Sequence, residues 1–156
     1  MIPAFAGMTV WNSMTKRILI LCTGNSCRSQ MAEGYLKSFD KELEVYSAGT
    51  KPADKVNPFA VKAMTEVGID ISNGIAEDVD KYVNQSFYYV ITVCDNAKEV
   101  CPVFNGEVKQ RLHMPFEDPY EATGTEEEVL AVYRRVRDEI KERFKRFYDE
   151  EIFTVN

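Results

Sequence analysis

The chain has 156 residues, of which 45% are hydrophobic and 28% are charged, and its formal net charge is −6 at pH 7. This length and composition predict one soluble globular domain that is large enough to bury a normal core. The acidic balance argues against nucleic acid or an anionic membrane as a partner, and no apolar run approaches the roughly 20 residues needed to span a bilayer.

An uncharged N-terminal segment, residues 1–13, precedes the Lys16-Arg17 pair that opens the first predicted strand. The segment lacks the basic start and the unbroken apolar core of a secretory signal. We expect residues 1–15 to be a poorly ordered extension, with Met14 as a natural start, and residues 16–150 to form the folded domain. The alternative is that the extension adds an edge strand.

After this segment, strand-like and helical patterns alternate along the chain. Asn57-Pro58 is an N-cap followed by proline, and Thr125 with Glu128 forms a capping-box pattern. The alternation predicts a single α/β domain in which a parallel sheet is covered by helices on both faces. In chain order, the predicted elements are a strand at 17–21, a helix at 30–36, a strand at 44–48, a helix at 57–68, a short helix at 78–84, strands at 87–93 and 110–114, and a helix at 125–147.

The loop between the first strand and the first helix carries the chemistry. It places Cys22 at the carboxyl end of a strand and Arg28 where the helix begins, and the residues between them are small. Ligands bind outside such strand ends, and a helix N-terminus attracts anions. Arg28 can offer two parallel donors, and the positive surroundings, with Ser29 as a further donor, favour the nucleophilic thiolate of Cys22. The loop therefore predicts attack of sulfur on a tetrahedral oxyanion; the alternative is a buried structural cysteine.

The four cysteines, at positions 22, 27, 94 and 101, allow three interpretations. A secreted disulfide framework fits poorly because no signal peptide is evident, and a zinc site fits poorly because the spacings are C-x4-C and C-x6-C and His113 is the single histidine. We favour a reduced cytoplasmic protein whose thiols react. Cys94 follows the strongest predicted strand, so we expect it on the same rim of the sheet as Cys22.

Residues 22–34, with the sequence CTGNSCRSQMAEG, resemble the signature of the low-molecular-weight protein tyrosine phosphatase superfamily, and the resemblance extends over about residues 16–147. It implies a four-stranded parallel sheet in the order 2-1-3-4, with Cys22 as the nucleophile. Asp118-Pro119 resembles the general-acid loop of this superfamily, which implies that Asp118 protonates the leaving oxygen; without the resemblance, Asp-Pro is a turn motif. The implied oxyanion site consists of Thr23, Gly24, Asn25, Ser26, Cys27, Arg28 and Ser29.

The resemblance is to two branches of the superfamily. A phosphatase needs Cys22, Arg28 and Asp118, and then water to release phosphate. Residues 93–102 resemble the second element of the thioredoxin-coupled arsenate reductases, and this implies a relay of three thiols. In that relay Cys22 attacks arsenate, Cys94 attacks the sulfur of Cys22 so that arsenite leaves, and Cys101 moves the disulfide to Cys94–Cys101, where thioredoxin reduces it.

We therefore expect an arsenate reductase, with a phosphatase of phosphate monoesters as the first alternative and a non-catalytic oxyanion-binding or redox-sensing protein as the second. Tyr120 gives the Asp-Pro-Tyr sequence of true phosphatases and favours the first alternative. The expected partners are an arsenate- or phosphate-like oxyanion and thioredoxin, and we expect a cytoplasmic monomer.

Asn25, Glu33 and Ser47 match positions that bind potassium in some reductases of this type, although capping and loop bracing are the alternative roles. No other cofactor is expected. Cys27, besides lending its backbone to the loop, is expected to be a small packed residue rather than a redox thiol. His113 is expected to pack rather than to catalyse.

Overall fold

The computed structural model describes residues 17–95, 99 and 101–153. The expected extension, residues 1–15, lies outside the described residues, so that expectation stays a prediction. The elements, in chain order, are β1 (Arg17–Cys22), α2 (Arg28–Phe39), β2 (Glu44–Gly49), α3 (Pro58–Thr65), η1 (Val79–Tyr82), β3 (Ser86–Thr92), β4 (Glu107–His113), η2 (Pro119–Glu121), α4 (Glu126–Phe147) and η3 (Tyr148–Phe153).

The sheet has the expected order β2-β1-β3-β4, and every pairing in it is parallel. β1 lies inside the sheet, where Leu21 is opposite Ala48 of β2 and Thr92 of β3. The four residues 18–21 are fully buried, because a central parallel strand is covered on both faces and its sequence is apolar without interruption. The carboxyl ends of β1 and β3 therefore meet at one edge of the sheet, as the sequence predicted.

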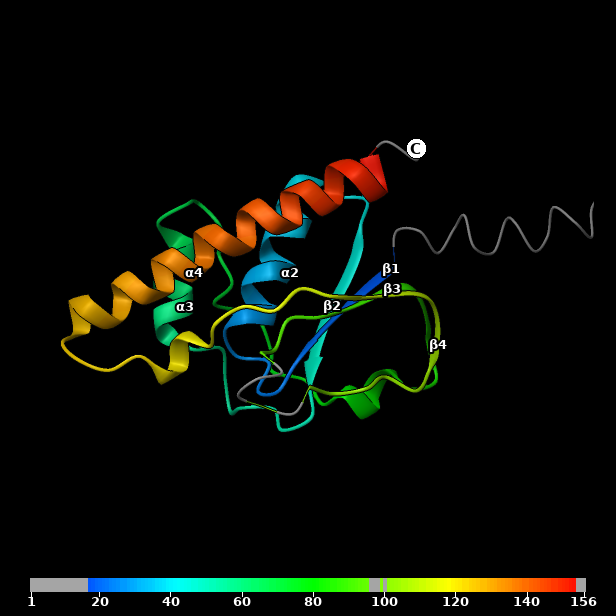
Figure 1. The fold of residues 1–156 in the computed structure, drawn as a ribbon, viewed down its shortest axis with the longest axis horizontal. Coiled ribbons are helices and arrows are strands. Elements are labelled where there is room, and N and C mark those ends of the chain that lie inside the picture. Colours follow the sequence, from blue (N-terminus) through cyan, green and yellow to red (C-terminus); the bar gives the residue numbers. More distant parts are fainter. Residues whose placement is uncertain (1–16, 96–98, 100, 154–156) are drawn as a thin grey trace, which may run out of the picture.

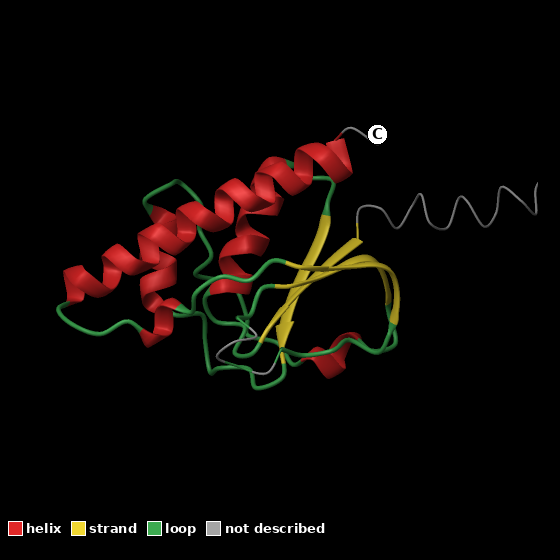
Figure 2. Cartoon of the chain, in the orientation of Figure 1, coloured by secondary structure: helices red, strands yellow, loops and turns green. Residues whose placement is uncertain are grey.

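The two faces of the sheet are covered differently. Ile18 and Ile20 belong to a large apolar core that α2, α3 and α4 complete, and all three α-helices lie on this side (Figures 1 and 2). Leu19 and Leu21 point to the other face, where a smaller core includes Tyr82 of η1 and Phe104. We expected helices on both faces. Within the described part of the chain, the second face is covered by one 3₁₀ turn and loop residues rather than by an α-helix.

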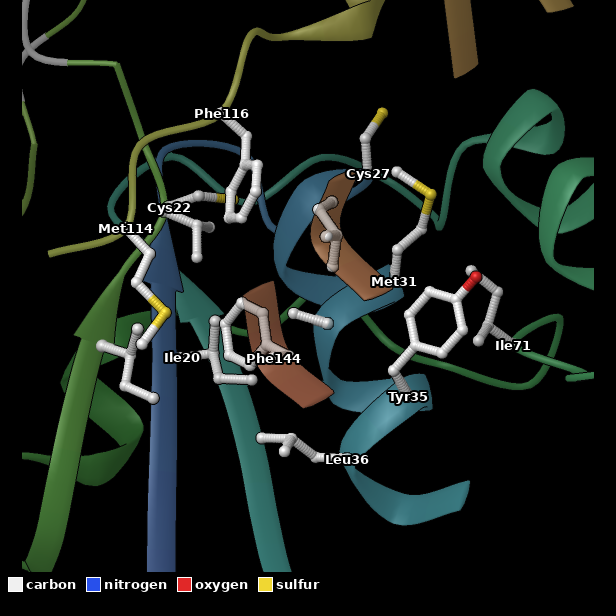
Figure 3. Close-up of a cluster of buried hydrophobic side chains, with 14 of the residues drawn as sticks. Ile20, Cys22, Cys27, Met31, Tyr35, Leu36, Ile71, Met114, Phe116 and Phe144 are labelled. Carbon is white, nitrogen blue, oxygen red and sulfur yellow. The ribbon is translucent and has the colours of Figure 1, made fainter. Parts of the chain in front are cut away.

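The long helix α4 closes the larger core. Its capping box is formed as the sequence predicted, with the Thr125 side chain accepting from the Glu128 backbone and the Glu128 side chain accepting from the Thr125 backbone. The buried stripe of the helix includes Phe144, which packs among side chains of β1 and α2 such as Ile20 and Leu36 (Figure 3). The packing holds α2, and hence the loop before it, against the sheet.

Some boundaries differ from the prediction. β4 begins at Glu107 instead of residue 110, because edge pairing with β3 tolerates polar residues that have one exposed side. α3 ends at Thr65, and Gly68 follows it with a φ of 82°, so that Ile69 N donates to Met64 O as in a Schellman cap. Among the described residues, none of the helices has the length and apolar character to cross a membrane.

Candidate active site

The loop after β1 curls around the sulfur of Cys22. The Asn25 backbone N–H donates to Cys22 Sγ at 3.3 Å, and Ser29 Oγ lies 3.0 Å from the same sulfur. Ser29 Oγ accepts a hydrogen bond from Asn25 Nδ2 at 2.7 Å, and its own proton can be donated to the sulfur. Cys22 is only 2% exposed, and its sulfur lies within reach of the Asn25 backbone N–H and the Ser29 hydroxyl.

The left-handed residue that turns this loop is Asn25, with a φ of 51°, rather than Gly24. A side chain at Gly24 would find ordinary van der Waals space, so the absence of one is not what lets the loop bend. The required glycine is Gly49 of β2, where a Cβ atom would lie 2.2 Å from the Thr23 carbonyl oxygen. The loop therefore depends on close backbone contact with the neighbouring strand.

Arg28 is the first residue of α2 and is 3% exposed. Its guanidinium donates to the Phe116 carbonyl at 3.2 Å and lies 3.5 Å from the carboxylate of Asp118. Burial alone would lower the pKa of Arg28, but hydrogen bonds to Glu99 and the nearby charges of Asp118 and Cys22 raise the pKa above its ordinary value. The side chain is thus a fixed positive charge beside the sulfur.

Asp118 forms the turn that its sequence suggests and also lies beside Arg28. One carboxylate oxygen accepts from Tyr120 N at 3.0 Å and so caps the 3₁₀ turn η2. The other carboxylate oxygen faces Arg28, and the side chain remains 28% exposed. The turn therefore fixes the acid at the mouth of the pocket, where it can reach both solvent and a bound oxyanion.

These groups line one open pocket of about 610 Å³. The pocket brings the predicted loop together with Asp118 and Tyr120 and with Asp95 and Glu99. All the contiguous loop residues from Cys22 to Arg28 contribute, whereas Ser29 lies behind them in contact with the sulfur. The arrangement can hold a tetrahedral oxyanion against a thiol, with an acid beside it.

The second pair of cysteines forms a disulfide in this structure, Cys94–Cys101, with the Cα atoms 5.7 Å apart. Val93 N donates to Leu21 O at 2.9 Å, so the β1–β3 pairing continues to the residues directly before Cys22 and Cys94. Cys94 is fully buried and Cys101 is partly exposed. Of the residues between the two cysteines, 96–98 and 100 lie outside the described residues.

Cys27 is placed differently from the other three cysteines. Its side chain is 3% exposed, and its sulfur lies 3.6 Å from Ser26 Oγ and 3.7 Å from the Tyr133 hydroxyl. Burial raises the pKa of Cys27 to about 11, so the group is a thiol near neutral pH. This environment agrees with a packed residue whose backbone, rather than its sulfur, lines the pocket.

The predicted potassium ligands take part in hydrogen bonds within the chain. The Ser47 hydroxyl donates to the Glu33 carboxylate, whereas Asn25 Oδ1 already accepts from the Glu77 backbone at 2.8 Å and from Gln30 Nε2 at 3.3 Å. The residues thus perform the bracing that was the alternative role. Potassium binding stays a prediction.

Two features of the structure were not predicted. His113 was expected to pack, but its ring is exposed and lies 2.7 Å from Thr92 Oγ1. Glu99 was not singled out at all, yet its carboxylate binds Arg28. An acidic residue in a polar segment carries no local signal of such a contact, because the contact joins residues 71 positions apart.

Comparison with known proteins places this site in a family. Residues 17–153 match the family described as low molecular weight phosphotyrosine protein phosphatase. An arsenate reductase from Halalkalibacterium halodurans is 52% identical over 136 residues, which are 86% of this chain and 96% of the relative. One from Bacillus subtilis is 52% identical over 133 residues, which are 85% of this chain and 94% of the relative.

A solved structure, described as an arsenate reductase in the phosphate binding state, has a TM-score of 0.72 and 30% sequence identity. The match covers 86% of this chain and 97% of that chain. The similarity thus extends over the sheet, the helices and the pocket rather than over the loop alone. The chain belongs to the low molecular weight phosphotyrosine protein phosphatase family.

Proposed function

We propose that this protein reduces arsenate to arsenite with three of its cysteines. The observation that carries the proposal is the meeting of two elements at one sheet edge: the Cys22–Arg28 pocket and the Cys94–Cys101 disulfide. Hydrolysis of a phosphate ester needs the pocket and water, and it has no redox step that would require a disulfide beside the pocket. The names of the relatives at about half identity agree with this choice.

In the first step, the Cys22 thiolate attacks the arsenic atom of arsenate. Arg28 and the backbone N–H groups of residues 23–28 hold the oxygens, and a sulfur–arsenic bond replaces one oxygen–arsenic bond. Asp118 supplies a proton to the departing oxygen, which leaves as water. Arsenic is still pentavalent after this step.

In the second step, Cys94 as a thiolate attacks the sulfur of Cys22. The new sulfur–sulfur bond forms while the sulfur–arsenic bond breaks, and its electron pair goes to arsenic, which becomes trivalent and leaves as arsenite. The pairing of Leu21 with Val93 supports this step because it brings the two strand ends together. The two electrons come from the two cysteine sulfurs.

In the third step, Cys101 attacks Cys94, which frees Cys22 and leaves the Cys94–Cys101 disulfide. We propose that a thioredoxin then reduces this disulfide by thiol–disulfide exchange and is itself oxidised. The partial exposure of Cys101 supports this route, because exchange requires access to a sulfur. A reducing cytoplasm is the compartment in which such a cycle can repeat.

The relay predicts different behaviour for its last two thiols. We expect Cys101→Ser to make about one arsenite per chain and then to stop as a Cys22–Cys94 disulfide, so that steady-state turnover with thioredoxin falls by about 10³-fold. We expect Cys94→Ser to make almost no arsenite even in the first turnover. Rapid-quench measurement of arsenite per chain, with mass spectrometry of the disulfide, separates the two variants.

Unchanged steady-state turnover in either variant would show that the relay is wrong. An exposed serine supplies the matched control, because Ser72→Ala removes a hydroxyl that bonds only Asp70 in a loop outside the pocket. This control is expected to keep full activity.

The phosphatase is the second candidate, and Tyr120 favours it. This side chain lines the pocket and is 70% exposed, so it could contact an aryl phosphate. Both reactions use the same loop because arsenate and phosphate have nearly the same shape. Fast aryl-phosphate hydrolysis without arsenate turnover would establish the phosphatase instead.

Asp118→Asn is expected to lower kcat for arsenate reduction by about 10²-fold, because a positioned general acid contributes about 10²- to 10⁴-fold. Phosphate binding should be retained, because the substitution removes a carboxylate whose negative charge repels the anion. Steady-state kinetics between pH 6 and 8, with phosphate titration in parallel, check this expectation. Asp149→Asn, on the exposed far end of the chain, is the control, and equal kcat values for the two variants would remove Asp118 from the mechanism.

A further inference from the structure

The Glu99 carboxylate accepts the hydrogen bonds that a bound oxyanion needs. Arg28 Nη1 donates to Oε2 at 2.6 Å and Arg28 Nη2 donates to Oε1 at 2.9 Å, so both arms of the guanidinium are used. The Thr23 hydroxyl donates to Oε1 at 2.9 Å, and the Asp95 backbone N–H donates to Oε2 at 3.0 Å. Two of these four donors come from Arg28 and a third from Thr23, both of the predicted oxyanion loop.

An oxyanion and this carboxylate compete for the same place. Glu99 lines the pocket together with Cys22 and Asp118, and its side chain is 18% exposed. The two arms of Arg28 cannot complete a bidentate pair with Glu99 and with an arsenate or phosphate oxygen pair at once. In addition, a second anion beside Glu99 would meet a like charge in a largely desolvated site. Binding of an oxyanion therefore requires Glu99 to leave Arg28.

The charge of Glu99 persists at neutral pH. Hydrogen bonds from Arg28 lower the pKa of Glu99 to about 2, against the burial that raises it. The folded pKa lies below the ordinary value near 4.3, so the pairing is complete above that pH and weakens only as the pH falls towards 2. The competitor is thus an anion throughout the range in which arsenate reduction is measured.

Glu99 lies within the ring that the Cys94–Cys101 disulfide closes. The closed ring restricts the positions that Glu99 can take, which raises the effective concentration of its carboxylate at Arg28. A dithiol reductant takes the disulfide to two thiols, is itself oxidised to a disulfide, and opens the ring. The same carboxylate then samples more conformations and competes less well with a dissolved anion.

We propose that Glu99 is an internal ligand of the oxyanion site that excludes arsenate and phosphate while the Cys94–Cys101 disulfide is closed. The inference rests on the proposed function of the pocket as an oxyanion site, and it adds a regulation of that site by the redox state. The oxidised chain then binds more weakly a new arsenate that it has no electrons to reduce. The Glu99 carboxylate also keeps Arg28 in an ion pair until a reductant has opened the disulfide.

The test measures the affinity for inorganic phosphate of the disulfide and dithiol forms. A full-length Cys22→Ser background leaves Cys94–Cys101 as the disulfide available to the pocket, and isothermal titration gives Kd before and after dithiothreitol. We expect phosphate to bind at least about tenfold more weakly in the disulfide form. In Glu99→Gln and Glu99→Ala the disulfide form should approach the affinity of the dithiol form.

Glu42→Gln, an exposed substitution in the turn before β2, should keep the redox difference in full. Circular dichroism shows whether each variant is folded, and Glu99→Ala provides a second test if Glu99→Gln still hydrogen-bonds Arg28. Equal phosphate affinity of the parent and both Glu99 variants in the disulfide form would overturn the inference and leave the proposed function intact. Failure of both redox forms to bind phosphate would overturn the oxyanion site itself.

Discussion

Cys22→Ser is expected to abolish arsenate turnover, with a loss of at least about 10⁴-fold. A serine hydroxyl is a far weaker nucleophile than a thiolate, and it cannot form the sulfur–sulfur bond through which arsenic receives its electrons. The donors that surround the sulfur, from the Asn25 backbone and Ser29, remain in place for the smaller oxygen. The coupled assay with thioredoxin, thioredoxin reductase and NADPH measures the loss.

Phosphate binding supplies the control for this variant. Because Arg28 and the loop backbone hold the anion, Cys22→Ser should bind phosphate within about threefold of the parent dithiol form. Loss of both turnover and binding would point to a collapsed loop rather than to a missing nucleophile. Retained turnover would remove Cys22 from the reaction.

Arg28→Lys is expected to lower kcat/KM for arsenate by about 10²- to 10³-fold, although it conserves the charge. Lysine offers a point charge in place of two parallel donors, and it cannot at the same time reach the Phe116 carbonyl and the pocket as the guanidinium does. The phosphate Kd of the dithiol form should rise together with KM. Kinetics and phosphate titration of the same preparation check both effects.

Arg135→Lys is the matched control because Arg135 is a half-exposed arginine of α4. Its two ion pairs, with Glu139 on the same helix and with Glu117 in the loop before η2, lie at the surface. Such exposed pairs contribute little, so its activity should stay within about twofold of the parent. An Arg28→Lys variant as active as Arg135→Lys would show that charge alone suffices and that the bidentate geometry is unnecessary.

The local elements of the fold were predictable from short stretches of sequence. The apolar run 18–21 predicts a central strand because only burial on both faces accommodates it, and the Thr125–Glu128 box predicts a helix start because both of its hydrogen bonds close within one turn. The first residues of β4 were less predictable. An edge strand can include polar residues such as Glu107, and their pairing depends on the neighbouring strand β3.

The candidate site likewise has a part that the sequence shows and a part that only the structure shows. The loop from Cys22 to Ser29 is contiguous, so its order of thiol, small residues and arginine could be recognised without a structure. The residue that turns the loop could not be recognised in this way: Asn25 adopts the left-handed conformation, and its side chain is held by Ser29, Gln30 and the Glu77 backbone. Two of those three partners lie on the same loop and helix, but the third is 52 residues away.

The sequence by itself determined the start of the chemistry, a thiol and an arginine at a strand–helix junction, and through its resemblance it indicated the thiols that complete it. Only the tertiary structure decided which carboxylates pair with Arg28: that of Asp118, at 3.5 Å, and that of Glu99. The physical reason is that these contacts join residues 71 and more positions apart, and the sheet register and the closed disulfide determine where such side chains meet.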